Sequence, residues 1–266
     1  MKSGVIRFSI VTPVWAASEL QEKELLRAIE SIKNQTYDKK KIEHIIVNDG
    51  SIYPIKIPSY PWIRVVNQQN LNRISAYNAG FKKAKGQIFT LLDSDDEYDP
   101  EYLSRVDKWF RKSKEKLFNF GCKYVHADGG VAYREAFHLE RRKVGHKPFG
   151  GGNIVNGTFV FHRSVYDDLG AFPDPIVKDI DCTDINYGGV RELRMTSPYD
   201  FSAYAQIEFP EIREYFMVNF EAEPNKIIKE LGNPWGNDYF LFYKYTRKYH
   251  SKAIDKKWLY IVHPSP

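Results

Sequence analysis

Short, dense runs of β-branched residues alternate with helical segments over the first hundred residues, and this alternation restricts the possible folds more than any other feature. Four runs have the composition of buried strands, at 5–11, 42–47, 63–66 and 87–92. Segments with apolar residues at helical spacing lie between or after them, at 18–32, 72–84 and 99–110. Such a series predicts an α/β fold with a mostly parallel central sheet flanked by helices.

Two of the predicted helices begin with recognisable capping residues. Ser18 and Gln21 match a capping box, and an apolar stripe follows over 25–32. Asp99 before Pro100 has the form of a cap followed by proline at the first helical position. Both patterns predict where the chain leaves a loop and enters a helix.

The second half of the chain is less regular. We predict a strand at 157–162, a short helix at 164–169, a helix at 238–249 and a final strand at 258–262. The stretch between residues 174 and 234 shows no dominant period. The sequence therefore predicts an irregular C-terminal region.

Composition and charge exclude several classes of protein. Hydrophobic residues make up 42% and charged residues 27%, which is globular rather than disordered composition. The net charge of +5 favours anionic ligands, without the dense basic face of a nucleic-acid-binding protein. No apolar run approaches the ~20 residues of a transmembrane segment, and no secretion signal is recognisable. We expect a cytoplasmic protein in which Cys122 and Cys182 are buried thiols.

Polar residues follow each of the four predicted strands at the point where the strand ends. The clusters are Thr12-Pro13, 48–51, 67–70 and 93–96. In open α/β sheets, ligands bind outside the carboxyl ends of the strands. We therefore expect all four clusters to meet at one edge of the sheet and to form the functional site.

The acidic cluster Asp93-Ser94-Asp95-Asp96 carries the strongest chemical signal. Three carboxylates at the end of a buried strand repel one another unless a cation or hydrogen bonds compensate them. Carboxylate oxygens select Mg²⁺ or Mn²⁺, which bridge one or two carboxylates to substrate phosphates. The alternative is an acidic turn in which Asp96 or Asp99 caps a helix. The neighbouring polar strand ends favour the metal interpretation.

Asp49, within Asn48-Asp49-Gly50-Ser51, is placed to bind a nucleotide. A carboxylate at a strand end can accept hydrogen bonds from a base or a ribose, although these four residue types also form ordinary turns. We expect its side chain to carry little packing. The sequence has neither a glycine-rich dinucleotide loop nor a phosphate loop after the first strand, which favours a nucleotide held by carboxylates and metal.

Several segments occur in an order that is more specific than any one of them. In the first part they are 8–14, 46–51, 70–80 and 91–96. Further along they are 157–163, 170–174, Gly236-Asn237-Asp238 and Val262-His263-Pro264. Together they resemble the successive motifs of family 2 glycosyltransferases with the GT-A fold, with matching order and spacing over roughly residues 6–112.

The resemblance implies a single domain over residues 1–266. About 1–112 would form the nucleotide-sugar-binding half and about 113–266 the acceptor-binding and catalytic half. The implied donor is a nucleotide-diphosphate sugar such as a UDP- or GDP-sugar, and the acceptor is a glycan or a lipid-linked molecule. The implied donor-binding residues are Thr12, Pro13, Asp49, Asn70, Arg73, Asn78, Asp93 and Ser94.

The resemblance also implies Mn²⁺ or Mg²⁺ at the Asp-x-Asp motif formed by Asp93 and Asp95, and an inverting transfer with Asp238 as the base. Asn237 departs from the family, which usually has Glu at this position. At Asn72 and Tyr77 the family often has Gly and Arg. The segment from 174 to 236 is longer than usual, so the acceptor stays unidentified.

Four residues have both a chemical and a structural interpretation. A carboxylate such as Asp238 can remove the proton of an acceptor hydroxyl, but at a helix start it can also be a cap. His263 can turn towards a metal or a phosphate, or lie at the surface. Trp235 is suited to stack on an acceptor sugar beside Asn237, or to fill the core. Arg73 can bind phosphate or remain solvated.

Two other functions compete with glycosyl transfer. A sugar nucleotidyltransferase also needs a parallel sheet and metal-binding carboxylates, but it ordinarily has a glycine-rich basic loop where this chain has 15–18. A non-catalytic nucleotide- or sugar-binding module is the second alternative. The basic residues Lys244, Arg247, Lys248 and Lys252 are compatible with peripheral contact with an anionic membrane, although solvated surface is the simpler interpretation.

Overall fold

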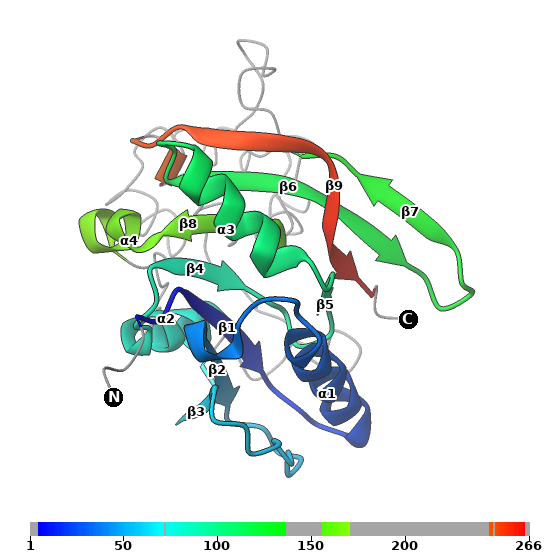
Figure 1. The fold of residues 1–266 in the computed structure, drawn as a ribbon. Coiled ribbons are helices and arrows are strands. Elements are labelled where there is room, and N and C mark those ends of the chain that lie inside the picture. Colours follow the sequence, from blue (N-terminus) through cyan, green and yellow to red (C-terminus); the bar gives the residue numbers. More distant parts are fainter. Residues whose placement is uncertain (1–4, 72, 137–155, 171–244, 247, 264–266) are drawn as a thin grey trace, which may run out of the picture.

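The computed structural model describes residues 5–71, 73–136, 156–170, 245–246 and 248–263, and it has the predicted α/β architecture (Figure 1). The described strands join one sheet in the order β3-β2-β1-β4-β8-β6-β9-β5, with β7 paired to β6. Their bounds are β1 Phe8–Val14, β2 Ile42–Asp49, β3 Ile63–Gln68, β4 Ile88–Leu91, β5 Glu97–Tyr98, β6 Leu117–Val125, β7 Val131–Arg134, β8 Phe159–His162 and β9 Ser251–Val262.

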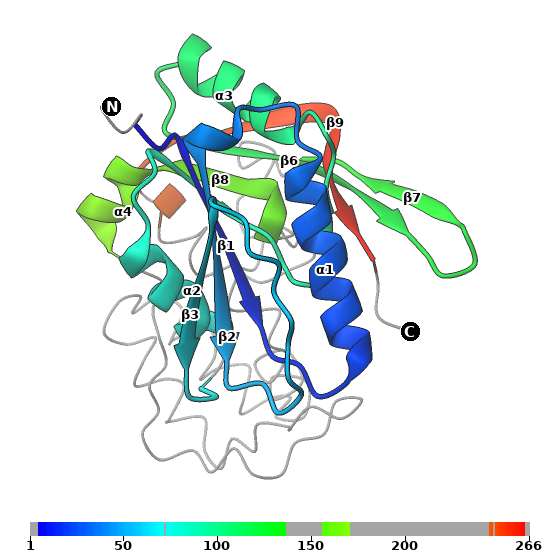
Figure 2. The ribbon, with the colours of Figure 1, turned by 60° about the horizontal axis from the view of Figure 1, so that its bottom comes forward.

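The first half of the sheet is parallel, as the sequence predicts. β2 and β4 flank β1, and β3 extends the sheet beyond β2, all in parallel pairing. In the register of β1, Phe8 lies opposite Ile42 on one side and Ile88 on the other. Figure 2 shows β1, β2 and β3 pointing the same way, so their carboxyl ends share one edge of the sheet.

The second half of the sheet is mixed. β8 joins β4 and β6 in antiparallel pairing, whereas β9 runs parallel to β6. The hairpin of β6 and β7 extends away from the rest of the sheet (Figure 1). Neither strand of this hairpin was predicted, although Leu117-Phe118-Asn119-Phe120 is a dense aromatic run of the kind that forms strands.

Helices cover both faces of the sheet. Their bounds are α1 Glu19–Lys33, α2 Arg73–Lys83, α3 Tyr102–Lys112 and α4 Arg163–Leu169, with short 3-10 turns η1 at Lys39–Lys41 and η3 at Asn156–Thr158. Because side chains alternate along a strand, Phe8 and Ile10 of β1 pack with α1 and α3, and Val11 packs with α2 and α4. Each face therefore has its own apolar core.

The capping box of α1 is confirmed. The backbone N–H of Ser18 donates to Gln21 Oε1 over 2.9 Å, and the side chain of Ser18 accepts from the first turn. The start of α3 differs from its prediction by two to three residues. Asp99 accepts from the N–H of Glu101 over 2.9 Å, so it closes a turn that precedes the helix.

The remaining predictions for the second half have mixed outcomes. The predicted strand at 157–162 begins as η3 and continues as β8. The predicted helix at 164–169 forms α4, and the residue after it is Gly170, whose φ of 75° favours glycine. β9 begins seven residues before the predicted strand at 258–262 because it pairs along the whole of β6. The predicted helix at 238–249 lies largely outside the described residues, as does Cys182. Cys122 is buried, as expected.

Among the described residues, no helix combines the length and the hydropathy needed to span a membrane.

Candidate active site

The polar clusters after β1, β2 and β4 meet at one edge of the sheet. The loops after β1 and β2 are tied together, since the N–H of Ala16 donates to Ser51 Oγ over 2.9 Å and Ile52 donates back to the Ala16 carbonyl over 3.0 Å. Gly50, with a φ of 69°, lies so close to Asn70 that a Cβ atom would come within 2.6 Å of its backbone nitrogen. The loop after β3 is therefore packed against the loop after β2.

Asp49 holds these loops in place. Its residue is only 5% exposed, and Oδ1 accepts from Gln68 Nε2 over 2.6 Å and from the N–H of Leu71 over 3.1 Å. The expectation that this side chain carries little packing is therefore wrong. Gln68 and Leu71 cover the Asp49 side chain and donate to it. The predicted contact of Asp49 with a nucleotide would therefore depend on the conformation of the loop after β3.

The acidic cluster after β4 concentrates negative charge. Burial, followed by repulsion from Asp93, raises the pKa of Asp95 to about 6, and the nearby Arg73 acts in the opposite direction. Burial and repulsion from Asp95 and Asp93 raise the pKa of Asp96 well above its usual range. The cluster therefore favours a bound proton or a cation over three bare charges.

Two tyrosines organise this cluster. The hydroxyl of Tyr77, on α2, donates to Asp93 Oδ1 over 2.6 Å. Tyr260, buried on β9, accepts from the N–H of Asp93 over 3.1 Å. It also forms a hydrogen bond with Asp96, which offsets part of the rise in the pKa of that carboxyl. At Gly157 any Cβ atom would lie inside the ring of Tyr260, so glycine is required there for the tyrosine to reach the acidic turn.

His263 also reaches this edge. Its N–H donates to Asp96 Oδ1 over 3.0 Å, and its Nε2 lies 2.6 Å from Glu97 Oε1. When Nε2 carries the proton, Glu97 fixes that tautomer and leaves the Nδ1 lone pair as an acceptor. Metal-binding histidines commonly have this kind of carboxylate partner.

Thr12 and Pro13 are buried within β1. The Thr12 hydroxyl is 2.8 Å from Nε2 of His44, on β2. Burial lowers the pKa of His44 to about 3, so its ring is neutral. Thr12 and His44 are fully buried. A ligand at the carboxyl ends of the strands would therefore contact the residues that follow Pro13 in the chain.

The other predicted donor-binding residues lie around the same edge with different exposure. Arg73 and Asn78 are half-buried on α2, and both have interactions within the protein. Ser94 is half-buried in the acidic turn, and Asn70 is exposed on the loop after β3. The structure therefore places Arg73 and Asp93 near Asp95 and His263 beside Asp96, while Asp49 contacts the loop after β3 at the same edge. Trp235, Asn237 and Asp238 lie outside the described residues.

The acidic turn fits a divalent cation bound by a small number of carboxylates. Burial and the charge of Asp93 raise the pKa of Asp95, so a nearby cation would favour its ionised form. Mg²⁺ or Mn²⁺ typically takes one or two carboxylates and completes its shell with substrate phosphates and water. Among the described residues, no group of three or more His, Cys, Asp or Glu side chains is arranged around a single metal position. Asp93 and Asp95 would hold such an ion, and His263 lies against the neighbouring Asp96 and Glu97.

Sequence reasoning missed the roles of Tyr77, Tyr260 and Glu97. The sequence indicates Tyr77 only as part of the predicted helix at 72–84 and as a departure from a family pattern, and Tyr260 only as one position of the predicted strand at 258–262. The partners of Tyr260 in the acidic turn lie more than 160 residues away in the chain. Only the pairing of β9 with β5 and β6 brings them together.

The sequence model of glycosyl transferase family 2 matches residues 9–170. An uncharacterized glycosyltransferase of Bacillus subtilis, YwdF, is 29% identical over 163 residues, which cover 56% of each chain. The undecaprenyl-phosphate 4-deoxy-4-formamido-L-arabinose transferase of Proteus mirabilis is 28% identical over 140 residues, or 42% of each chain. The chain spans about half or less of the length of these curated relatives.

A solved structure agrees on the fold. The crystal structure of S. aureus TarS 1–349 in complex with UDP superposes with a TM-score of 0.55 at 14% sequence identity, covering 98% of this chain and 61% of that one. At this identity the likeness concerns the fold. It is in keeping with the GT-A architecture that the sequence predicts.

Proposed function

Because the chain belongs to glycosyl transferase family 2, whose model matches more than half of it, we propose that it is a metal-dependent inverting glycosyltransferase. It moves a sugar from a nucleotide-diphosphate donor to an acceptor hydroxyl. The observation that carries this proposal is the acidic turn after β4, in which burial and mutual repulsion raise the pKa values of Asp95 and Asp96. An edge of this kind suits a cation and a diphosphate.

The donor lies along the carboxyl ends of β1, β2 and β4 in this proposal. The loop that Asp49 holds contacts the base and the ribose, and Arg73 faces the phosphates, since guanidinium pairs well with phosphate oxygens. The UDP in the TarS crystal structure supports a uridine nucleotide. The relative named for transfer to undecaprenyl phosphate supports a lipid-linked acceptor rather than a free sugar.

Mn²⁺ or Mg²⁺ held by Asp93 and Asp95 would neutralise the diphosphate leaving group. Tyr77 and Tyr260 keep the acidic turn in place for that role. Glu97 orients the imidazole of His263 towards the same edge. These residues act by position and charge, which is the largest contribution that a protein makes in group transfer of this kind.

Asp238 serves as the base that removes the acceptor proton, with Trp235 and Asn237 on the acceptor side. Replacing Asp238 by Asn keeps its volume and capping ability but removes its basicity. We expect unchanged donor affinity and a turnover reduced by roughly two to four orders of magnitude. Turnover above about a tenth of wild type would refute the assignment.

Product analysis tests the reaction class. The purified chain is incubated with Mn²⁺ and a panel of UDP- and GDP-sugars, and the released phosphates are separated. Nucleoside diphosphate, formed with Mn²⁺ and absent with excess EDTA, supports the proposal. A parallel incubation contains a nucleoside triphosphate and a sugar phosphate, and release of pyrophosphate there would identify a nucleotidyltransferase instead. Tight donor binding without any product from acceptor mixtures would identify a binding module.

A further inference from the structure

The opposite edge of the sheet contains a basic pocket that the proposed reaction does not use. The pocket has a volume of about 270 Å³, well above the roughly 10–15 Å³ that is needed on this measure to hold one water molecule. It lies where β1, β2 and β4 begin, beside the last turn of α3. The residues that line it are Val5, Arg7, Tyr37, Lys41, Gln87 and Arg111.

Asp107 of α3 fixes the positions of the cationic side chains. Its Oδ1 accepts from Arg7 Nε over 2.7 Å, and its Oδ2 accepts from Arg111 Nε over 2.9 Å and from the Tyr37 hydroxyl over 3.0 Å. Burial alone would raise the pKa of Asp107, but the hydrogen bonds from Arg111, Arg7 and Tyr37 hold it below its usual range. Asp107 is therefore ionised, and two guanidinium groups are held beside each other.

The described residues do not balance the positive charge of this pocket. Arg7, Arg111 and Lys41 contribute three cations, and Asp107 contributes one anion. Within the described part of the chain, no second carboxylate lies within ion-pair distance of these three cations. The side chain of Arg111 is 64% exposed and that of Arg7 is 18% exposed. A bound anion could therefore contact Arg111 at the surface and Arg7 deeper in the pocket.

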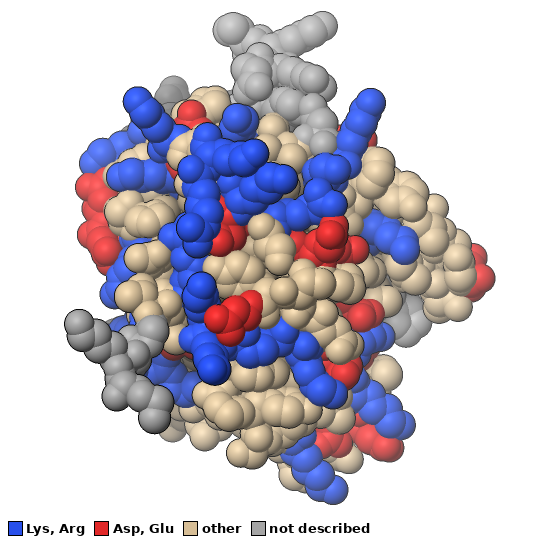
Figure 3. All heavy atoms as spheres, viewed as in Figure 1, with Lys and Arg blue, Asp and Glu red and all other residues tan. Residues whose placement is uncertain are grey.

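The surroundings extend the positive potential. Lys108 and Lys112 are exposed on α3, and Lys40 is exposed on η1. Figure 3 shows Lys and Arg side chains gathered on the face that carries α3. Burial and then the charges of Arg7 and Lys116 lower the pKa of His162, so the positive field also reaches β8.

We propose that this pocket, formed by Arg7, Lys41 and Arg111 and organised by Asp107, binds a phosphate group. Two guanidinium groups held side by side match the geometry of phosphate oxygens, and a lysine adds a point charge at the rim. Gln87, whose Oε1 accepts from Arg7 Nη1 over 2.6 Å, fixes the second nitrogen of that guanidinium. The ligand is a phosphate monoester or diester.

This pocket is separate from the donor edge. It lies at the amino end of β1, whereas the acidic turn and Asp49 lie beyond the carboxyl ends of the parallel strands. A seven-residue strand spans about 20 Å. One nucleotide-diphosphate sugar could not occupy both places, so the two sites can be tested separately.

An NMR titration of the full chain with inorganic phosphate tests the proposal, because shifts of amide signals locate the bound ion. We expect saturable shifts at Arg7, Lys41 and Gln87. The variant with both Lys41→Gln and Arg111→Gln should raise the dissociation constant at least tenfold, and Arg105→Gln on the same helix should leave it unchanged. Shifts absent in wild type, persisting in the double variant, or reproduced by sodium chloride at equal ionic strength would overturn the proposal.

A second arm identifies the source of the phosphate. The same proteins are sedimented with vesicles of phosphatidylglycerol in phosphatidylcholine, and with phosphatidylcholine alone. Binding to the anionic vesicles that is lost in the double variant but kept in Arg105→Gln assigns the site to a lipid headgroup. Phosphate binding in the titration without vesicle binding assigns it to a soluble phosphate ester. Both results are independent of transferase activity.

Discussion

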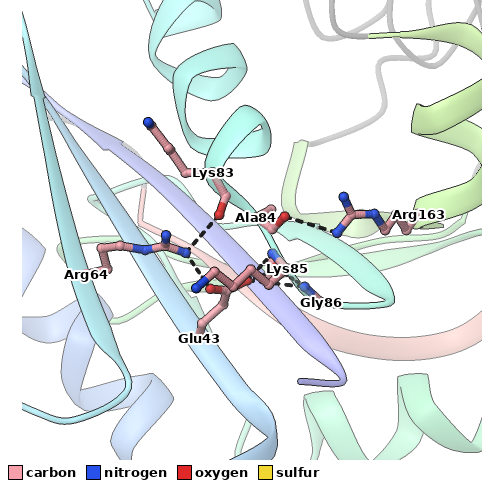
Figure 4. A network of polar contacts seen from close by, with 8 residues as sticks. Glu43, Arg64, Lys83, Ala84, Lys85, Gly86 and Arg163 are labelled. Carbon is pink, nitrogen blue, oxygen red and sulfur yellow. Dashed lines mark hydrogen bonds and ion pairs between the residues drawn. The ribbon is translucent and has the colours of Figure 1, made fainter. Parts of the chain in front are cut away.

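Buried carboxylates at the two ends of the parallel strands differ in their hydrogen bonds and in their pKa values. We call these ends of the sheet the amino edge and the carboxyl edge. At the amino edge, Glu43 of β2 is 8% exposed and has a donor for both of its oxygens. Oε1 accepts from Ser9 Oγ over 2.6 Å and from the N–H groups of Lys85 and Gly86, and Oε2 accepts from Arg64 over 2.6 Å (Figure 4). This carboxylate joins β1, β2, β3 and the loop before β4.

At the carboxyl edge, three carboxylates lie close together in the acidic turn, and their hydrogen bonds to Tyr77, Tyr260 and His263 do not offset their burial and mutual repulsion. Asp95 and Asp96 have raised pKa values because they are buried near each other and near Asp93, whereas Asp107 at the amino edge has a lowered one. Acidification should therefore weaken the amino edge and relieve the carboxyl edge. The difference fits our proposal, in which the amino edge is arranged for stability and the carboxyl edge has electrostatic strain that a bound cation would relieve.

Removing Glu43 should have the largest effect on stability. Glu43→Ala leaves Ser9, Gly86 and Arg64 without their common acceptor in a largely buried place, and we expect a loss of about 3 kcal/mol in the free energy of unfolding. Urea denaturation measures it. Glu30→Ala, which breaks an exposed pair with Lys33, serves as a control and should cost less than about 1 kcal/mol. Equal losses of stability in both variants would mean that the buried network of Glu43 contributes no more than an exposed ion pair.

Neutralising Asp95 should have the opposite sign. Its pKa is about 6 in the folded protein and about 4 when unfolded, so the folded state binds more protons between these values and stability falls as pH rises through them. Asp95→Asn removes this penalty and should stabilise the protein by about 2 kcal/mol at pH 8. The gain should vanish near pH 4.

Activity should move against stability in that variant. Asp95→Asn should lose the rise in melting temperature that Mn²⁺ with nucleoside diphosphate gives the wild type, together with most of the turnover. Asp167→Asn, at an exposed position on α4, is the matched control and should keep both. A destabilised Asp95→Asn at pH 8 would contradict the assignment of strain to the acidic turn.

The contrast between the edges also separates what the sequence could predict from what it could not. The parallel half of the sheet, the capping box of Ser18 and the convergence of polar strand ends follow from local period and residue type. The bond of Arg7 to Asp107 joins residues one hundred positions apart, and that of Asp93 to Tyr260 joins residues 167 apart. No local pattern encodes such pairs, because the packing of β9 and α3 creates them.

Asp49 shows that a residue's position in the fold can be predicted when the environment of its side chain cannot. Its place at a strand end was predictable from the turn residues that follow β2. Its burial was not, because that depends on how Gln68 and Leu71 fold back over it. The sequence therefore predicted the position of the residue in the fold better than the environment of its side chain.

A smaller effect should follow from changing the partner of His263. Glu97→Gln keeps a side chain within reach of the imidazole but removes the negative charge that favours the Nε2–H tautomer. If His263 contacts the metal through Nδ1, Mn²⁺ affinity should fall about tenfold, at the low end for such partners. Calorimetric titration with Mn²⁺ measures it, and Glu101→Gln, exposed before α3, is the control. Unchanged affinity would leave His263 without a role in metal binding.

The smallest effect should come from Tyr77→Phe, which deletes only the hydroxyl that donates to Asp93. The ring should stay stacked on Phe81, whose centroid is 6.2 Å away, so the melting temperature should change little. Losing a typical hydrogen bond costs roughly 1 kcal/mol, and we expect the loss as an approximately fivefold weaker affinity for Mn²⁺ with nucleoside diphosphate, because Asp93 is no longer fixed. Tyr166→Phe on α4 is the matched control. A loss of stability with unchanged affinity would instead make Tyr77 part of the supporting scaffold, and the carboxyl edge would then resemble the amino edge more closely than its pKa values indicate.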